Sequence, residues 1–174
     1  MTRYAAFLRG VSPMNLKMPD LKVALDQAGF AAVKTLLSSG NVVFSGRRAA
    51  DIAIENKVAA AIENKVGKKF GVIVRTIEEL RELLDSDPFK AFHLPAGAKR
   101  VVTFLRSAPE TKLELPPELD GARIWTVRGR EALSAYTRSD KGPVFMVLLE
   151  KTFGKDVTTR TWDTVAKVAK AGEA

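Results

Sequence analysis

Two apolar runs flank a polar turn in the stretch VKTLLSSGNVVF, residues 33–44. Short apolar runs bounded by turn residues are typical of strands, so we predict strands over 33–37 and 42–44. Between them, Ser38-Ser39-Gly40-Asn41 supplies Gly and Asn, which tolerate positive φ in tight hairpin turns. The stretch therefore predicts a β-hairpin, and the elements on either side of it decide the fold.

Helical and extended patterns alternate around this hairpin. Pro19 and Gly29 bracket a helix upstream, Gly67 ends a longer helix downstream, and Thr76 with Glu79 forms a capping-box sequence. The expected order is a strand over 3–9, a helix over 19–29, the hairpin, a helix over 50–66, a strand over 72–75 and a helix over 76–84. This β-α-β-β-α-β order predicts an α+β fold that is ferredoxin-like over residues 1–88.

Residues 89–174 predict a smaller α+β subdomain, packed with the first as one globular unit. Its expected elements are a strand over 100–105, a connector over 112–119, a hairpin of 123–128 with 131–137, a helix from Gly142-Pro143 to Gly154, and a helix from about Trp162. Trp162 falls on the apolar stripe of the last helix, so we expect it in the interior. No strong internal repeat is evident.

The composition excludes several chemistries. There is no cysteine and only one histidine, His93, which removes thiolate nucleophiles and clusters of cysteine or histidine metal ligands. We therefore expect no metal and no cofactor. No apolar run approaches the roughly 18 residues of a membrane span, and the N-terminus does not resemble a signal peptide, so we expect a cytoplasmic protein without membrane contact. The net charge of +8 favours anionic partners.

The first candidate segment is the strand exit Leu8-Arg9-Gly10, which leads through a loop to Lys17. An arginine at a strand end followed by glycine places a cation beside free backbone N–H groups, and such a concavity can hold an anion. The alternative is an ordinary strand exit with Arg9 in solvent. Arg9, Gly10 and Lys17 are candidate ligand-binding residues on the first interpretation.

Two further segments carry polar groups at the ends of elements. Ser39, Gly40 and Asn41 form a turn, and they would face a ligand if that turn lies near the first loop. The stretch TTRTWDT, 158–164, is expected at the start of the last helix, where unpaired N–H donors and an arginine would attract an anion. Thr159, Arg160 and Thr164 are the candidates there; the alternative is that Arg160 points to solvent.

Together these segments resemble a bacterial family, domain of unknown function 1697 (DUF1697). The resemblance rests on LRGVSPMN at 8–15, SSGNV at 38–42 and TTRTWDTV at 158–165. It implies an α+β fold of two small subdomains and no assigned activity. Here Pro13-Met14-Asn15 stands where members usually have a glycine pair, and Thr161 stands where they usually have asparagine. A ligand shared by the family would therefore be held differently here or not at all.

These observations favour binding of a small anionic or phosphorylated ligand, with Arg9 and Arg160 supplying charge. Whether the protein is an enzyme stays open, because neither a nucleophile and base pair nor a phosphate-binding P-loop is present. One alternative is nucleic-acid binding through basic strands, drawing on Arg123, Arg128, Arg130 and Arg138 around the second hairpin. Another is a protein-interaction module, which would require a contiguous exposed apolar patch.

Overall fold

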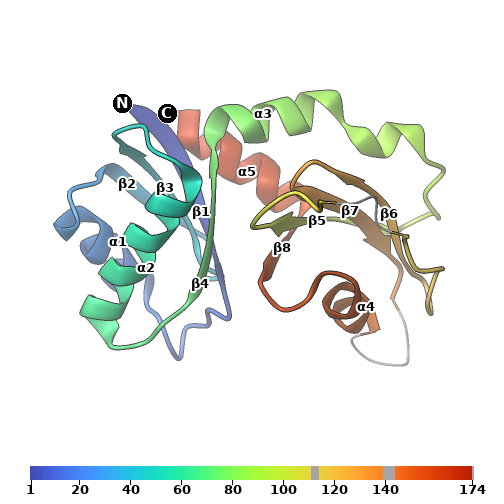
Figure 1. Cartoon of the computed structure of the whole chain (residues 1–174), viewed down its shortest axis with the longest axis horizontal. Coiled ribbons are helices and arrows are strands. Elements are labelled where there is room, and N and C mark those ends of the chain that lie inside the picture. The colour runs from blue at the N-terminus through green and yellow to red at the C-terminus, as the bar shows by residue number, and fades with distance from the viewer. Residues whose placement is uncertain (111–113, 139–143, 174) are drawn as a thin grey trace. The chain divides into compact units, whose positions relative to one another are not determined.

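The computed structural model describes residues 1–110, 114–138 and 144–173, and within these ranges it is a mixed α+β protein (Figure 1). Two antiparallel four-stranded sheets and five α-helices are present there. The strands are β1 (Thr2–Arg9), β2 (Ala31–Leu36), β3 (Asn41–Gly46), β4 (Gly71–Thr76), β5 (Lys99–Leu105), β6 (Ala122–Arg128), β7 (Glu131–Tyr136) and β8 (Val157–Thr161). The helices are α1 (Met18–Gln27), α2 (Asp51–Val66), α3 (Ile77–Ser86), α4 (Val144–Phe153) and α5 (Trp162–Glu173), with a 3-10 turn over Pro88–Ala91.

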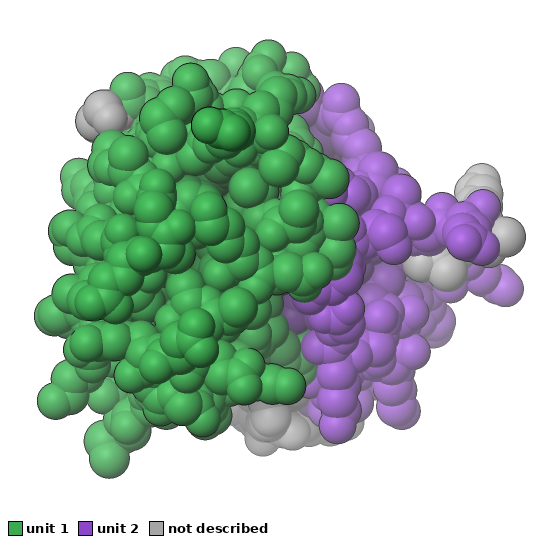
Figure 2. All heavy atoms as spheres, turned by 60° about the vertical axis from the view of Figure 1, so that its left-hand side comes forward, with its two compact units in different colours: residues 1–85, 165–174 green, residues 86–164 purple. Residues whose placement is uncertain are grey.

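The chain divides into two compact units, which Figure 2 distinguishes by colour. The first unit comprises residues 1–85 and 165–174, and the second comprises residues 86–164. Helix α5 therefore begins in the second unit and contributes most of its length to the first. Its far end is tied to strand β1, because Arg3 Nε donates to the carbonyl oxygen of Gly172 at 2.8 Å.

In the first unit the strands lie in the order β2-β3-β1-β4, and neighbouring strands are antiparallel. Helices α1 and α2 cover one face of this sheet. The core between them is aliphatic and aromatic, as alternation along the strands requires. Its members from the sheet include Tyr4, Ala6, Leu8, Val42, Phe44, Val72 and Val74, and its members from the helices include Leu21, Leu25, Ile54, Val58 and Ile62.

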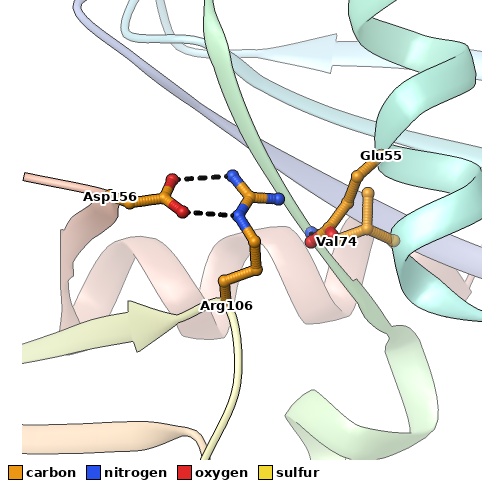
Figure 3. A network of polar contacts seen from close by, with 4 residues as sticks. All are labelled: Glu55, Val74, Arg106 and Asp156. Atoms are coloured by element: carbon orange, nitrogen blue, oxygen red, sulfur yellow. Dashed lines mark hydrogen bonds and ion pairs between the residues drawn. The ribbon is translucent and has the colours of Figure 1, made fainter.

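Two charged side chains are buried in the first unit. Glu55, on α2, accepts a hydrogen bond from the Val74 backbone N–H at 2.9 Å (Figure 3). Arg75 has no exposed surface and lies on the opposite face of the sheet, opposite Ala5 in the register, and its Nη1 donates to the Val74 carbonyl oxygen at 2.9 Å. Buried charges need such polar partners, because desolvation otherwise disfavours the ion.

In the second unit the strand order is β6-β7-β5-β8, again antiparallel. Helix α4 packs on β6, and Leu148 and Leu149 meet Ala122 and Ile124 in its core. The helical interpretation of the apolar run after residue 143 is confirmed. Its predicted start, Gly142-Pro143, and part of the predicted connector over 112–119 lie outside the described residues.

The two sheets share one connectivity, although the sequence shows no strong repeat. In each unit the first strand lies between the third and the fourth, and the second lies outside the third. A helix follows the third strand and another follows the fourth in both units. The first unit has a helix, α1, between its first two strands, whereas the described residues between β5 and β6 form none.

The prediction that residues 158–161 begin a helix is wrong. They belong to strand β8, which pairs with β5 and places Arg160 opposite Val102. The physical reason lies in the β-branched side chains of Val157, Thr158, Thr159 and Thr161, which favour a pleated strand. The helix begins at Trp162, so Arg160 precedes it and does not oppose its dipole from the first turn.

Candidate functional site

The strand exit at Arg9-Gly10 and the turn at Ser38–Asn41 come together in the first unit. The Leu8 backbone N–H donates to the Gly40 carbonyl oxygen at 2.9 Å. Gly40 has φ +87°, and a Cβ there would lie 2.9 Å from Leu8 Cβ and 3.0 Å from Val11 Cγ2. Only glycine meets both requirements, so Gly40 allows the turn to lie directly against the first loop.

Two asparagines hold this region together from within. Asn15 accepts from the Ser12 backbone N–H through Oδ1 at 2.8 Å and donates from Nδ2 to the Gly10 carbonyl oxygen at 2.8 Å. Asn41 is fully buried, and its Nδ2 donates to the Leu36 carbonyl oxygen and to Ser39 Oγ at 3.2 and 3.1 Å. The amide groups therefore fix the loop and the turn, and ligand contact by Asn41 stays a prediction.

The charged candidates of the first unit lie at the edges of this region. Arg9 is half-buried at the last position of β1, opposite Gly71 on β4. Gly10 is exposed at φ +79°, with no heavy atom within 4 Å of the position a Cβ would take. Lys17 is exposed immediately before α1, and Ser39 is exposed in the turn. Cationic and hydroxyl groups thus border a loop with an open backbone position.

The third segment is located in the second unit, where Arg160 is half-buried. Its Nη1 donates to Thr158 Oγ1 at 2.8 Å and to the Thr159 carbonyl oxygen at 2.7 Å. Burial lowers the pKa of Arg160 to about 10 because desolvation disfavours the charged guanidinium. Arg160 is therefore held by strand β8 itself.

Thr164 has a capping partner within the same segment. Its backbone N–H donates to Thr161 Oγ1 at 3.2 Å, and the two hydroxyls lie 3.0 Å apart. Thr161 is thus the N-cap of α5, which is the role that its capping oxygen allows. Trp162, the next residue, is 8% exposed, and its predicted interior position is confirmed. Its ring meets Phe89 edge-on at 5.3 Å between centroids.

The candidates accordingly form two groups on separate units. Arg9, Gly10, Lys17, Ser39, Gly40 and Asn41 belong to the first unit, and Thr159, Arg160 and Thr164 belong to the second. Direct contacts join the first loop to the turn within the first group. A ligand role for either group stays a prediction.

A feature that sequence reasoning missed lies at the exit of β5. Arg106 and Asp156 form a bidentate ion pair, with Nε to Oδ2 at 2.7 Å and Nη2 to Oδ1 at 2.8 Å (Figure 3). The pair borders an open hollow of about 450 Å³, whose lining includes Pro109, Glu110, Thr152 and Phe153. The signal was present, because Phe104-Leu105-Arg106 repeats Phe7-Leu8-Arg9 at the end of the equivalent strand.

Two kinds of site were searched for within the described ranges. No group of three or more His, Cys, Asp or Glu residues there is arranged to hold a metal ion. None of the helices in this part of the chain combines the length and apolarity that crossing a bilayer requires. His93 is an exposed loop residue.

Fold and site define an α+β protein with two four-stranded sheets of one connectivity and an arginine at the end of each first strand. The chain belongs to the family described as "Protein of unknown function (DUF1697)", whose model matches residues 1–131. That match includes the first and second candidate segments and ends before the third. A solved structure of a conserved bacterial protein from Streptococcus pneumoniae is similar, with TM-score 0.70, 18% identity and 98% of each chain covered. Among curated proteins, no match was found.

Proposed function

We propose that this protein binds a small anionic or phosphorylated ligand at the strand exit of its first unit. The observation that carries the proposal is the contact between the first loop and the turn, made by the Leu8–Gly40 hydrogen bond. This contact brings the Arg9-Gly10 exit and the Ser39 turn to one edge of the sheet. Arg9 supplies a guanidinium that matches carboxylate and phosphate oxygens, and exposed Lys17 adds positive charge to the same loop.

A fold assignment accompanies this proposal. We infer that the first unit is ferredoxin-like, and the strand order β4-β1-β3-β2 with two helices on one face supports it. The same strand order supports a related arrangement in the second unit, with the described residues after β5 replacing the first helix. Ferredoxin-like units serve many functions, so the ligand is argued from the site and not from the fold.

The test is a ligand-dependent thermal shift. Parent protein and Arg9→Gln should be melted with inorganic phosphate, a nucleotide and a dicarboxylate, because a ligand that binds only the folded state raises the melting temperature. We expect a concentration-dependent rise for the parent and none for Arg9→Gln. Arg48→Gln is the matched control, since it removes the same charge from an exposed position of the first unit. Equal shifts in parent and Arg9→Gln would refute the proposal.

The Arg160 group enters the same experiment as a separate question. If Thr159, Arg160 and Thr164 bind an anion of their own, Arg160→Gln should lose part of the shift that Arg9→Gln retains. A full shift in Arg160→Gln would assign Arg160 a purely structural role in strand β8.

Nucleic-acid binding is a second candidate, favoured by one observation in the second unit. The Arg123 guanidinium lies 4.0 Å from the centre of the Trp125 ring, and Phe92 packs on the same ring at 5.2 Å. Stacked arginine and aromatic groups are what single-stranded nucleic acids use. Arg128 contributes less, because its Nη1 donates to Ser86 Oγ at 2.9 Å. Binding to single-stranded RNA that weakens steeply with salt and fails in Arg123→Gln would support this candidate.

An interaction module is the remaining alternative. Met14 is 95% exposed at the tip of the first loop, and Leu37 is 49% exposed in the turn. Two exposed apolar side chains are ordinary for a protein surface and do not by themselves define a docking patch. Self-association that disappears in Met14→Ser would favour this alternative over ligand binding.

A further inference from the structure

The first strands of the two units end in the same way. In the first unit Leu8 pairs with Val72 and Arg9 with Gly71. In the second unit Leu105 pairs with Val157, so Arg106 and Asp156 are the next positions outward. The Leu105 N–H donates to the Arg130 carbonyl oxygen at 2.8 Å, as the Leu8 N–H donates to Gly40 at 2.9 Å. Arg9 and Arg106 are therefore equivalent, and so are Gly71 and Asp156.

The second unit shows how this strand exit holds an oxyanion. The carboxylate of Asp156 receives two parallel hydrogen bonds from Nε and Nη2 of Arg106, although its side chain is 67% exposed. Bidentate pairing of this kind is specific for planar or tetrahedral oxyanions. The Asp156 carboxylate thus occupies the place that an external carboxylate or phosphate would take beside the strand-end arginine.

The first unit has the same backbone position but no side chain on it. Gly71 is exposed, and a Cβ added there would lie 3.5 Å from Arg9 Cβ, an ordinary contact distance. The position beside Arg9 therefore has room for a side chain, and its residue supplies no carboxylate. The contrast between Gly71 and Asp156 separates a unit that contributes its own oxyanion from one that does not.

We propose that Arg9 binds the carboxylate or phosphate group of a small molecule beside Gly71, in the bidentate geometry that Asp156 adopts on Arg106. This proposal rests on the anion-binding function argued above and specifies the ligand group and its place. It also assigns Gly71 as a specificity position, because an acidic residue there would act as a built-in competitor. The second unit carries that competitor, so its strand exit does not take an external anion.

The experiment exchanges the two residues. Arginine Nε–Hε signals are followed by NMR during titration with inorganic phosphate and, in a second arm, acetate, after assignment with Arg9→Lys and Arg106→Lys. In the parent we expect the Arg9 signal to respond and the Arg106 signal to stay constant. Gly71→Asp should weaken binding at Arg9 by about tenfold or more, as loss of a charge-assisted contact implies. Gly71→Asn, the uncharged control of equal size, should stay within about threefold of the parent.

The reciprocal change creates a site instead of removing one. Asp156→Ala should make the Arg106 signal respond to phosphate, and this gain requires neither Gly71 variant to fold. If phosphate binds the parent but Gly71→Asp and Gly71→Asn bind it equally, the place beside Gly71 is wrong while the proposed function stands. If Asp156→Ala exposes a site at Arg106 but neither phosphate nor acetate binds the parent at Arg9, both proposals fail. A larger response to phosphate than to acetate would identify a phosphorylated ligand as the class.

Discussion

Arg75 and Arg160 donate the same hydrogen bond in two different sheets. The Nη1 atom of each bonds to the carbonyl oxygen of the preceding residue, at 2.9 Å for Arg75 and 2.7 Å for Arg160. Each arginine belongs to the fourth strand of its unit and is followed by a threonine that caps the next helix. The sequence VIVRTIEEL at 72–80 is accordingly matched by VTTRTWDTV at 157–165.

The two capping threonines should differ in strength. Thr76 Oγ1 accepts from the Glu79 N–H at 3.1 Å, and Glu79 Oε1 accepts from the Thr76 N–H at 3.1 Å, which confirms the predicted capping box. Thr161 makes only the first of these bonds, to Thr164. Thr76→Ala should lower the free energy of unfolding by about 1–2 kcal/mol and Thr161→Ala by about 0.5–1 kcal/mol. Urea unfolding of both, with Thr→Ser controls that keep the oxygen, measures the difference.

The contact between turn and loop gives a prediction about two glycines. Gly40→Ala combines positive φ with contacts of 2.9 and 3.0 Å, so it should destabilise by about 2–4 kcal/mol. Gly10→Ala shares the positive φ but meets open space, so it should cost only about 1 kcal/mol. Thermal melts of the two variants make the comparison. Equal losses would show that backbone strain alone, and not close packing on Leu8 and Val11, requires glycine at position 40.

The strand and helix order of the first unit was predictable because its signals are local. Pro19, Gly29, Gly67 and the Thr76–Glu79 pair mark the ends of helices, and the hairpin turn marks the strand pair between them. The contact of that turn with the first loop could be posed only as a condition. It depends on β1 pairing with β3, which joins residues far apart in the chain.

Strand β8 was missed because its hydroxyls have two interpretations. Threonine side chains serve both as helix caps and as β-branched strand residues, and only pairing with β5 decides between them. The shared connectivity of the units was missed for a related reason. Its surviving sequence signal is confined to short stretches such as FLR at 7–9 and 104–106, which recur by chance in many chains.

Trp162 should be a principal anchor at the start of α5. It is 8% exposed, its ring packs edge-on against Phe89, and the Arg100 guanidinium lies 5.7 Å from its centre. Trp162→Ala should lower the free energy of unfolding by about 3–5 kcal/mol, as loss of a buried aromatic does. Trp162→Phe should lose less than half of that, since it keeps a ring on Phe89. A Trp162→Ala variant that unfolds at the parental urea concentration would contradict this role.

The buried guanidinium of Arg160 should make stability depend on pH in the alkaline range. Burial lowers its pKa from 12.5 to about 10 in the folded protein. Between about pH 10 and 12.5 the unfolded chain therefore holds this proton more often than the folded one, so the free energy of unfolding contributed by Arg160 rises with pH. Below pH 9 both states are protonated and the contribution is constant. From pH 9 to 11 the rise should amount to about 1 kcal/mol.

The measurement is a comparison of unfolding curves, because other groups titrate in the same range. Parent and Arg160→Gln are unfolded in urea at pH 7, 9, 10 and 11 and followed by tryptophan fluorescence, since Trp125 and Trp162 both report on the second unit. The parent should gain stability relative to Arg160→Gln only above pH 9. Arg138→Gln, which removes an exposed arginine of the same unit, controls for overall charge and should track the parent. A constant difference between parent and Arg160→Gln across this range would mean that water reaches the Arg160 guanidinium in solution.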